Sequence, residues 1–322
     1  MSFVSDELGY INSEDFNLLG DARGLWHSLN YLIINYDFAG YYSLRFINII
    51  FASFVLIYIA RIFDDGKLSI FLLASCPFIF AMTYVNLRDL AIIFSALLVF
   101  DGLRRKSILG IALGLVALLT LRPLIAFVLL ISLAVFYLID TKSHKTYSGA
   151  FALLMLGLLS LIILYFGIDY FQSYLRYMEY LSVTDNQHRS ILAQEDSSPM
   201  RALLTYVFTP LPTSLFQRLL GSGASELGLA HDLIRILHQS LYFIMMFVML
   251  LNPKQTYNGI IRLFTSLGKE QKALILFLLA HAVVYSIHLA GIGHSRLKLP
   301  FQMAIGIVFY LIYIKNRFVK IR

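Results

Sequence analysis

Long apolar stretches fill most of the chain, and polar or charged residues separate them. The stretches fall at 44–63, 68–86, 89–103, 107–121, 123–139, 148–167, 233–251, 272–291 and 299–314. A helix needs about 20 apolar residues to cross the hydrocarbon core of a bilayer. The pattern therefore predicts an all-α, polytopic integral membrane protein with about nine transmembrane helices. The short pair on either side of Arg122-Pro123 could instead form one broken hairpin within the membrane.

The separating segments divide the chain into four regions. These are an external acidic N-terminal segment, a first group of membrane helices, one larger external loop, and a last group of membrane helices with a basic cytoplasmic tail, at 1–43, 44–167, 168–232 and 233–322. Prolines at 210 and 212 interrupt the apolar stretch 202–220 inside the loop, which predicts two interfacial helices rather than a span. Aromatic residues beside arginines in this loop suit either sugar stacking or the membrane interface.

Composition supports a membrane protein and excludes several other classes. The 322 residues are 59% hydrophobic and 14% charged, with a mean hydropathy of +0.74. Soluble proteins carry about 25% charged residues, so this chain is not a disordered segment or a cytosolic enzyme. Its single cysteine, Cys76, cannot form an internal disulfide. A disulfide scaffold is therefore excluded as well.

The basic residues predict which side of the membrane each loop occupies. Cytoplasmic loops are rich in Lys and Arg, so the tail with Lys315, Arg317, Lys320 and Arg322 is placed in the cytoplasm. Alternation along the chain then puts every lysine except Lys298 on the cytoplasmic side. The net charge of +7 is explained by this topology, and no nucleic-acid partner is expected.

The outer basic residues other than Lys298 are all arginines, and several of them lie at span ends. Arginine presents a planar fork that matches phosphate or carboxylate with two hydrogen bonds. Arg88 precedes Asp89 between two spans, where the pair could mark a ligand cavity. It could equally be a local ion pair that caps the helix starting near Asp89.

Two further outer sites are candidates. Arg122, before Pro123, is either a ligand contact or an arginine that reaches the interface along its aliphatic stem. His294, Arg296 and Lys298 lie in one loop that enters the final helix, where they could bind a lipid pyrophosphate; otherwise this is an exceptional positive outer loop. His281 and His288 share a helix face without a third ligand, so they are interpreted as packing residues.

The opening residues Asp6 and Glu7 form a carboxylate pair. Such a pair can act as general base toward a sugar hydroxyl, or hold a divalent cation that bridges a pyrophosphate; a solvated pair is the alternative. No cofactor motif occurs in the sequence. The chain has no phosphate-binding loop, dinucleotide fingerprint or nucleophile elbow.

The order of these motifs resembles a known group. Asp6-Glu7 and Tyr10, then Pro77, Asn86-Leu87-Arg88-Asp89 and Leu121-Arg122-Pro123, resemble bacterial GT-C-type polyprenyl-phosphate-dependent glycosyltransferases. Pro210-Leu211-Pro212 and the 294–300 loop also resemble external loops of this group and of Wzy-like O-antigen polymerases. These enzymes have a transmembrane helix before the acidic loop, whereas this sequence begins at the loop. Either Met1 is an internal position of a longer protein, or the amino terminus lies outside.

The resemblance implies an inverting membrane glycosyltransferase or O-antigen polymerase. It implies a multi-pass protein of the bacterial inner membrane, acting at the periplasmic face on undecaprenyl-(pyro)phosphate-linked sugars in O-antigen, capsule or exopolysaccharide synthesis. Asp6 would be the base, supported by Glu7. Arg88, Arg122 and Arg296 would stabilise the leaving phosphate, and Asp89 would orient Arg88 or the acceptor.

Other functions remain open from the sequence. Chain-length or export proteins are further candidate partners beside the lipid-linked sugar and the bilayer. A transporter or flippase of lipid-linked sugars would place charges near the bilayer midplane, whereas the charges here gather at one face and the centres of the spans are nearly uncharged. A non-catalytic membrane subunit is the third alternative. Polymerase and single-sugar transferase are not distinguished.

Overall fold

The computed structural model describes residues 24–35, 42–84, 88–139, 199–223, 228–288 and 295–315. Every regular element in these ranges is helical, so the expected all-α class is confirmed for this part of the chain. Three helical stretches are long and apolar enough to cross a membrane: Arg45–Phe63, Leu229–Leu251 and Leu297–Lys315. These stretches support a membrane protein. The count of nine crossings stays a prediction, and the stretch 148–167 lies outside the described residues.

The first described helix, α2 (Gly24–Asn35), lies within the segment 1–43 that was expected to be external and acidic. Trp26 of this helix is buried, and its ring lies 6.4 Å from the ring of Phe51. Asn30 donates a hydrogen bond to the Trp26 carbonyl at 2.7 Å. The segment 1–43 therefore contains a helix that packs on the rest of the protein.

Helix α3 (Tyr42–Phe63) is followed by a second apolar stretch that the sequence predicted as one span. In the structure this stretch is broken into α4 (Gly66–Ser75), the short α5 (Phe78–Ala81) and the 3-10 turn η1 (Met82–Tyr84). The described part of the stretch 68–86 is therefore not one continuous helix, and its crossing of the membrane stays a prediction. The break falls at Cys76-Pro77, because proline has no N–H to bond the preceding turn.

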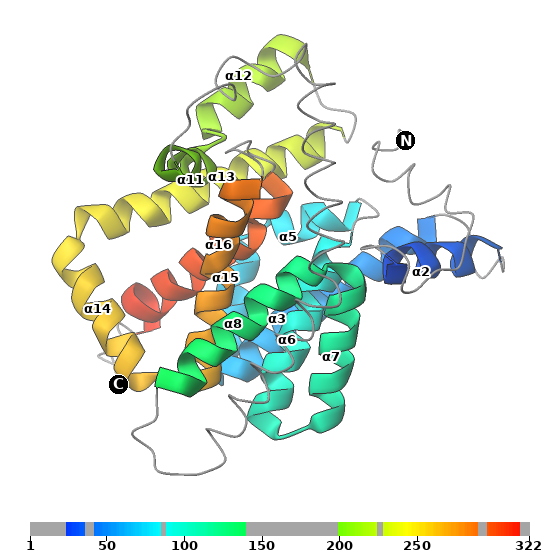
Figure 1. The fold of residues 1–322 in the computed structure, drawn as a ribbon. Helices are drawn as coiled ribbons and strands as arrows, with labels where there is room; N and C mark the ends of the chain where they lie inside the picture. The colour runs from blue at the N-terminus through cyan, green and yellow to red at the C-terminus, as the bar shows by residue number, and fades with distance from the viewer. Residues whose placement is uncertain are drawn as a thin grey trace.

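Helices α6 (Asp89–Arg105) and α7 (Ile108–Leu121) form a tight antiparallel hairpin (Figure 1). Lys106 turns the chain with a φ of 58°, and the Ser107 hydroxyl caps α7 by accepting from the Gly110 N–H at 3.2 Å. Gly114 allows the close approach, since a Cβ there would lie 2.7 Å from the Ser95 carbonyl oxygen. Pro123 then begins α8 (Pro123–Ile139), at the position where a helix tolerates proline.

Helices α11 (Pro199–Phe208) and α12 (Pro212–Ser222) are separated by a short link that contains a cis Thr209-Pro210 bond. The predicted helix pair over 202–220 is confirmed, while its interfacial position stays a prediction. The Tyr206 hydroxyl of α11 donates to the Leu297 carbonyl at 2.8 Å. This hydrogen bond ties the pair to the last helix.

The C-terminal part begins with the long helix α13 (Leu229–Leu251). It continues through α14 (Pro253–Ser266), α15 (Lys269–His288) and α16 (Ser295–Phe309), which ends in the π-helical segment η4 (Tyr310–Lys315). Helix α15 packs against α8, α11 and α16. Its buried residues, with those of α3, α6 and α16, form much of the hydrophobic core.

Candidate functional site

The two ends of α6 each carry a group of charged residues, about 24 Å apart at 1.5 Å per residue. We call the group at its start the Arg122 end, formed by Arg88, Asp89, Arg122 and Tyr285. We call the group at its finish the Arg104 end, formed by Arg61, Asp64, Asp101, Arg104 and Arg105. Arg88 and Arg122 were predicted to lie on the outer side of the membrane. The two groups lie at opposite ends of one helix.

Arg88 and Asp89 lie where α6 begins, as one interpretation of the sequence predicted. Asp89 occupies the first turn, where a carboxylate suits the positive end of the helix dipole. The Arg88 guanidinium donates to the carbonyl of Leu121, the last residue of α7, at 2.6 Å. Since the last four carbonyls of a helix lack intrahelical donors, Arg88 caps α7 and fixes the junction between the two helices.

Arg122 lies in extended backbone between α7 and α8, where its side chain meets a third helix. Its guanidinium lies 3.9 Å from the Asp89 carboxylate and 5.0 Å from the centre of the Tyr285 ring on α15. The side chains of Arg122 and Asp89 are 17% and 13% exposed. The Asp89 carboxylate is therefore close enough to form an ion pair with the Arg122 guanidinium, but the two groups are too far apart for a hydrogen bond.

Tyr285 was not among the predicted site residues. It lies one turn after His281, whose Nδ1 contacts the Phe277 carbonyl oxygen at 2.9 Å. That local contact and the burial of His281 agree with the packing role expected for it. The sequence alone could not indicate Tyr285, because its contact with Arg122 depends on how α15 packs beside the junction of α7 and α8.

Lys298 lies in the first turn of α16. Its side chain is buried, and its ammonium donates to the carbonyl oxygens of Tyr206 and Thr209 and, at 3.3 Å, to the Thr209 hydroxyl. The ammonium also lies 4.8 Å from the centre of the Tyr206 ring. Lys298 thus connects α16 with the end of α11. Its ammonium N–H groups are hydrogen-bonded to oxygen atoms of the protein.

The remaining predicted residues lie at or beyond the edges of the described chain. Asp6, Glu7 and His294 are outside the described residues. Arg296 lies in the first turn of α16, two residues before Lys298. The structure therefore brings together Arg88, Asp89 and Arg122, and these three carry the candidate site.

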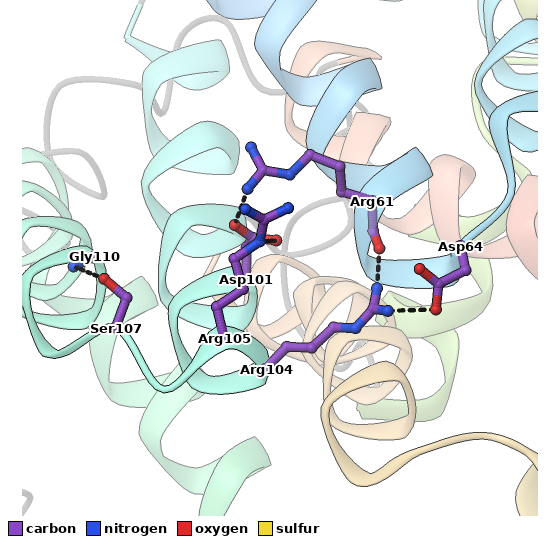
Figure 2. Close-up of polar contacts among 7 residues, drawn as sticks. All are labelled: Arg61, Asp64, Asp101, Arg104, Arg105, Ser107 and Gly110. Atoms are coloured by element: carbon purple, nitrogen blue, oxygen red, sulfur yellow. Dashed lines mark hydrogen bonds and ion pairs between the residues drawn. The ribbon is translucent and has the colours of Figure 1, made fainter.

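The Arg104 end is a tighter network that the sequence did not single out as a site (Figure 2). Asp101 is buried and pairs with Arg61 at 2.8 Å and with Arg105 at 3.3 Å. Arg104 bonds both the Asp64 carboxylate and the Arg61 carbonyl. These contacts join the end of α3 to the end of α6.

The hydrogen bond and the opposite charges of Asp64 and Arg104 shift the pKa values of both groups. The hydrogen bond from Arg104 lowers the pKa of Asp64 below its ordinary value of 3.8. The same bond raises the pKa of Arg104. Both groups are therefore charged at neutral pH, and the pair acts as a structural contact.

Two neighbouring contacts extend this network to the C-terminal segment. Lys315 lies 3.1 Å from Asp65, and the Tyr310 hydroxyl donates to the same carboxylate at 3.2 Å. The Asp65 side chain also caps α4 by accepting from the Lys67 N–H at 3.1 Å. One carboxylate therefore connects α4 with η4.

A second feature missed by the sequence is an uncharged polar layer between α13 and α16. His238 Nε2 lies 2.7 Å from Gln302 Oε1, and the Gln302 amide donates to Gln239 Oε1 at 2.9 Å. All three side chains are buried, and the ring of Phe78 stacks on His238 with centroids 5.6 Å apart. These residues carry no formal charge and belong to no known motif. The layer forms only because α13 and α16 pack against each other, so the sequence could not reveal it.

The described residues contain no group of three or more His, Cys, Asp or Glu side chains placed to hold a metal ion. Asp6 and Glu7, the carboxylate pair that could hold a divalent cation, lie outside this part of the chain. Comparisons of the whole chain find no matching protein-family model, no similar curated protein and no similar solved structure.

Proposed function

We propose that this protein is a membrane glycosyltransferase or polymerase of polysaccharide assembly, which uses sugar donors linked to undecaprenyl phosphate or pyrophosphate at the periplasmic face of the bacterial inner membrane. The observation that best supports this proposal is the setting of Arg122. Its guanidinium lies where α6, the α7–α8 junction and α15 meet, 3.9 Å from Asp89 and 5.0 Å from the Tyr285 ring centre. This geometry leaves N–H groups that can turn toward a phosphate.

The proposed chemistry assigns each described residue a task. When the bond between the sugar and the lipid phosphate breaks, negative charge grows on the leaving phosphate, and arginine donors stabilise it. Arg122 is the direct donor, while Asp89 and the Tyr285 ring orient its guanidinium plane. Arg88 holds the junction through Leu121. Following the resemblance, Asp6 takes the proton from the acceptor hydroxyl as the new glycosidic bond forms with inversion.

A strain that lacks the gene and produces variants from a plasmid tests this proposal. Replacing Arg122 with Lys keeps the charge but removes the fork, so surface polysaccharide should fall about 100-fold, the cost of losing one oriented transition-state donor. Arg105→Lys is the matched control, because Arg105 lies at the other end of α6 and should leave production unchanged. Membrane levels of both variants are measured in parallel.

The gel pattern of the deletion strain separates the two enzyme classes. Single repeat units without a ladder would identify a polymerase, and an intact ladder of altered mobility would identify a transferase that completes the repeat. Full polysaccharide production by both Arg122→Lys and Arg122→Gln would contradict the phosphate-binding role. An unchanged pattern in the deletion strain would contradict the proposed function as a whole.

The buried polar layer favours a second candidate, a transporter of lipid-linked sugars. His238 and Gln239 lie near the middle of the candidate span Leu229–Leu251, where transporters place their substrate sites, and they are hydrogen-bonded with Gln302 of the candidate span Leu297–Lys315. Accumulation of complete lipid-linked units on the cytoplasmic leaflet of the deletion strain would support transport. Accumulation on the periplasmic leaflet would support the enzyme.

A further inference from the structure

Helix α14 has three distinct faces, and the first packs on the end of the chain. The Thr256 hydroxyl lies 2.6 Å from the Tyr313 hydroxyl. One turn on, a Cβ on Gly259 would lie 2.6 Å from a side-chain carbon of Ile312, so glycine is required for this close approach. Both contacts are with η4. This face fixes how α14 is rotated about its axis.

The second face of α14 is apolar and exposed. Residues three and four positions apart share a helix face, and four large side chains follow this spacing and are all exposed: Tyr257, Ile260, Ile261 and Phe264. Helix α14 has no buried residue at all. The hydrophobic side of α14 is therefore exposed in the part of the chain that the structure describes.

The third face is polar and basic. Lys254, Gln255, Asn258 and Arg262 are exposed along it. The helix sequence from Pro253 to Ser266 contains no Asp or Glu. This face therefore has a positive charge without an acidic residue of its own helix to balance it.

The position of α14 in the chain indicates what covers the apolar face. The helix starts two residues after Leu251, the last residue of the candidate span α13. The final turns of α13 expose Phe247, Leu250 and Leu251, which would face lipid in a membrane-spanning helix. The apolar side of α14 follows directly on this surface.

We infer that α14 lies in the membrane interface, with its apolar face against the acyl chains and its basic face on anionic phospholipid headgroups. An amphipathic helix with aromatic residues on one side and Lys and Arg on the other is typical of this position. Anionic lipids attract such basic residues near the membrane surface. Because α14 also packs on η4, bound lipid would hold the Lys315–Asp65 contact in place. This inference does not depend on the proposed enzymatic function.

Site-specific fluorescence on the full chain in vesicles tests the inference. Single cysteines replace Phe264 on the apolar face and Gln255 on the polar face, in a Cys76→Ala background, and each carries an environment-sensitive dye. The vesicles contain phosphatidylcholine and phosphatidylglycerol at a fixed ratio. Spin-labelled acyl chains should quench the dye at 264 at least about twice as strongly as the dye at 255, while aqueous iodide should show the reverse order.

Two results would overturn the inference. Equal quenching of both positions by iodide would show a helix in water. Protection of position 264 from iodide and from spin-labelled lipid would show that a second copy or another protein covers the face. If Cys76→Ala does not fold, Cys76 can be retained, because it is buried and the unmodified protein supplies the labelling blank.

The charge component has its own measurement. Spin-labelled phosphatidylglycerol should quench the dye at 264 a few-fold more efficiently than spin-labelled phosphatidylcholine, since each basic residue near the surface attracts anionic lipid. The double substitution Lys254→Gln with Arg262→Gln should remove this preference and leave acyl-chain quenching intact. Equal quenching by the two lipids without these substitutions would overturn the role of the basic face.

Discussion

The two ends of α6 carry the same kinds of side chain but pair them differently. At the Arg104 end, Asp101 is 4% exposed and lies 2.8 Å from Arg61 and 3.3 Å from Arg105. At the Arg122 end, Asp89 lies 3.9 Å from Arg122, beyond hydrogen-bond length. A tyrosine ring lies beside an arginine at both ends, Tyr285 beside Arg122 at 5.0 Å and Tyr58 beside Arg61 at 4.7 Å.

This difference distinguishes a structural network from a candidate binding site. A buried carboxylate with two arginine partners stabilises helix packing, because removing it would leave buried charge uncompensated. A loosely paired arginine beside a tyrosine ring can bind an anion without first breaking a strong contact. The comparison predicts that stability depends mostly on the Arg104 end, and ligand binding on the Arg122 end.

The largest expected effect on stability comes from Asp101→Ala. The substitution leaves Arg61 and Arg105 without their shared carboxylate. A broken buried pair costs about 3–5 kcal/mol, and the partial exposure of Arg61 reduces this to about 2–3 kcal/mol. The measurement is thermal unfolding of the purified protein in detergent.

Asp89→Ala is the matched control at the other end. Its looser contact should limit the stability loss to about 1 kcal/mol or less. Equal losses of stability in Asp101→Ala and Asp89→Ala would contradict the difference between the two ends, because both ends would then stabilise helix packing.

The next effect concerns Lys298, whose ammonium is bonded to protein carbonyls. Lys298→Met keeps a similar side-chain length but leaves the Tyr206 and Thr209 carbonyl oxygens without this donor, which should cost about 1–3 kcal/mol. Thermal unfolding measures the loss, and binding of a lipid phosphate should be unchanged. If Lys298→Met kept its stability but lost phosphate binding, Lys298 would instead be a ligand-binding residue.

The smallest effect is the pH dependence of the Asp64–Arg104 pair. Because Arg104 lowers the pKa of Asp64 in the folded protein, the pair contributes stability above the ordinary carboxyl pKa of about 3.9 and loses it as the pH falls through the lowered value. Unfolding temperatures of the unmodified protein and of Asp64→Asn should differ slightly at pH 6, and the difference should shrink as the pH falls below the ordinary carboxyl pKa. A difference that grows in acid would show that another group controls this contact.

The sequence predicted much of the helical framework, because apolar stretches and prolines determine where helices run. The expected stretch 107–121 corresponds to α7 at Ile108–Leu121. Pro123 is the first residue of α8, a position where proline is common in helices. The break at Cys76-Pro77 was missed, since one proline inside an apolar stretch can kink a span or end it.

The contacts between charged residues could not be predicted in the same way. Arg122 and Asp89 were both candidates, but nothing in the sequence shows that residues 33 positions apart face each other, or that Tyr285 lies beside them. The buried layer of His238, Gln239 and Gln302 was missed for the same reason. Such pairs depend on which helices are neighbours, and hydrophobic periodicity does not determine that.

Direct binding by the purified protein tests the central claim that the Arg122 end holds a lipid-linked phosphate. Calorimetry would compare a short-chain polyprenyl phosphate with the matching polyprenol, which lacks only the phosphate. We expect the unmodified protein and Arg105→Gln to prefer the phosphate at least about 10-fold, and Arg122→Gln to lose that preference, as expected for a charge-assisted contact. Equal affinity for the two lipids, or an undiminished preference in Arg122→Gln, would contradict the account.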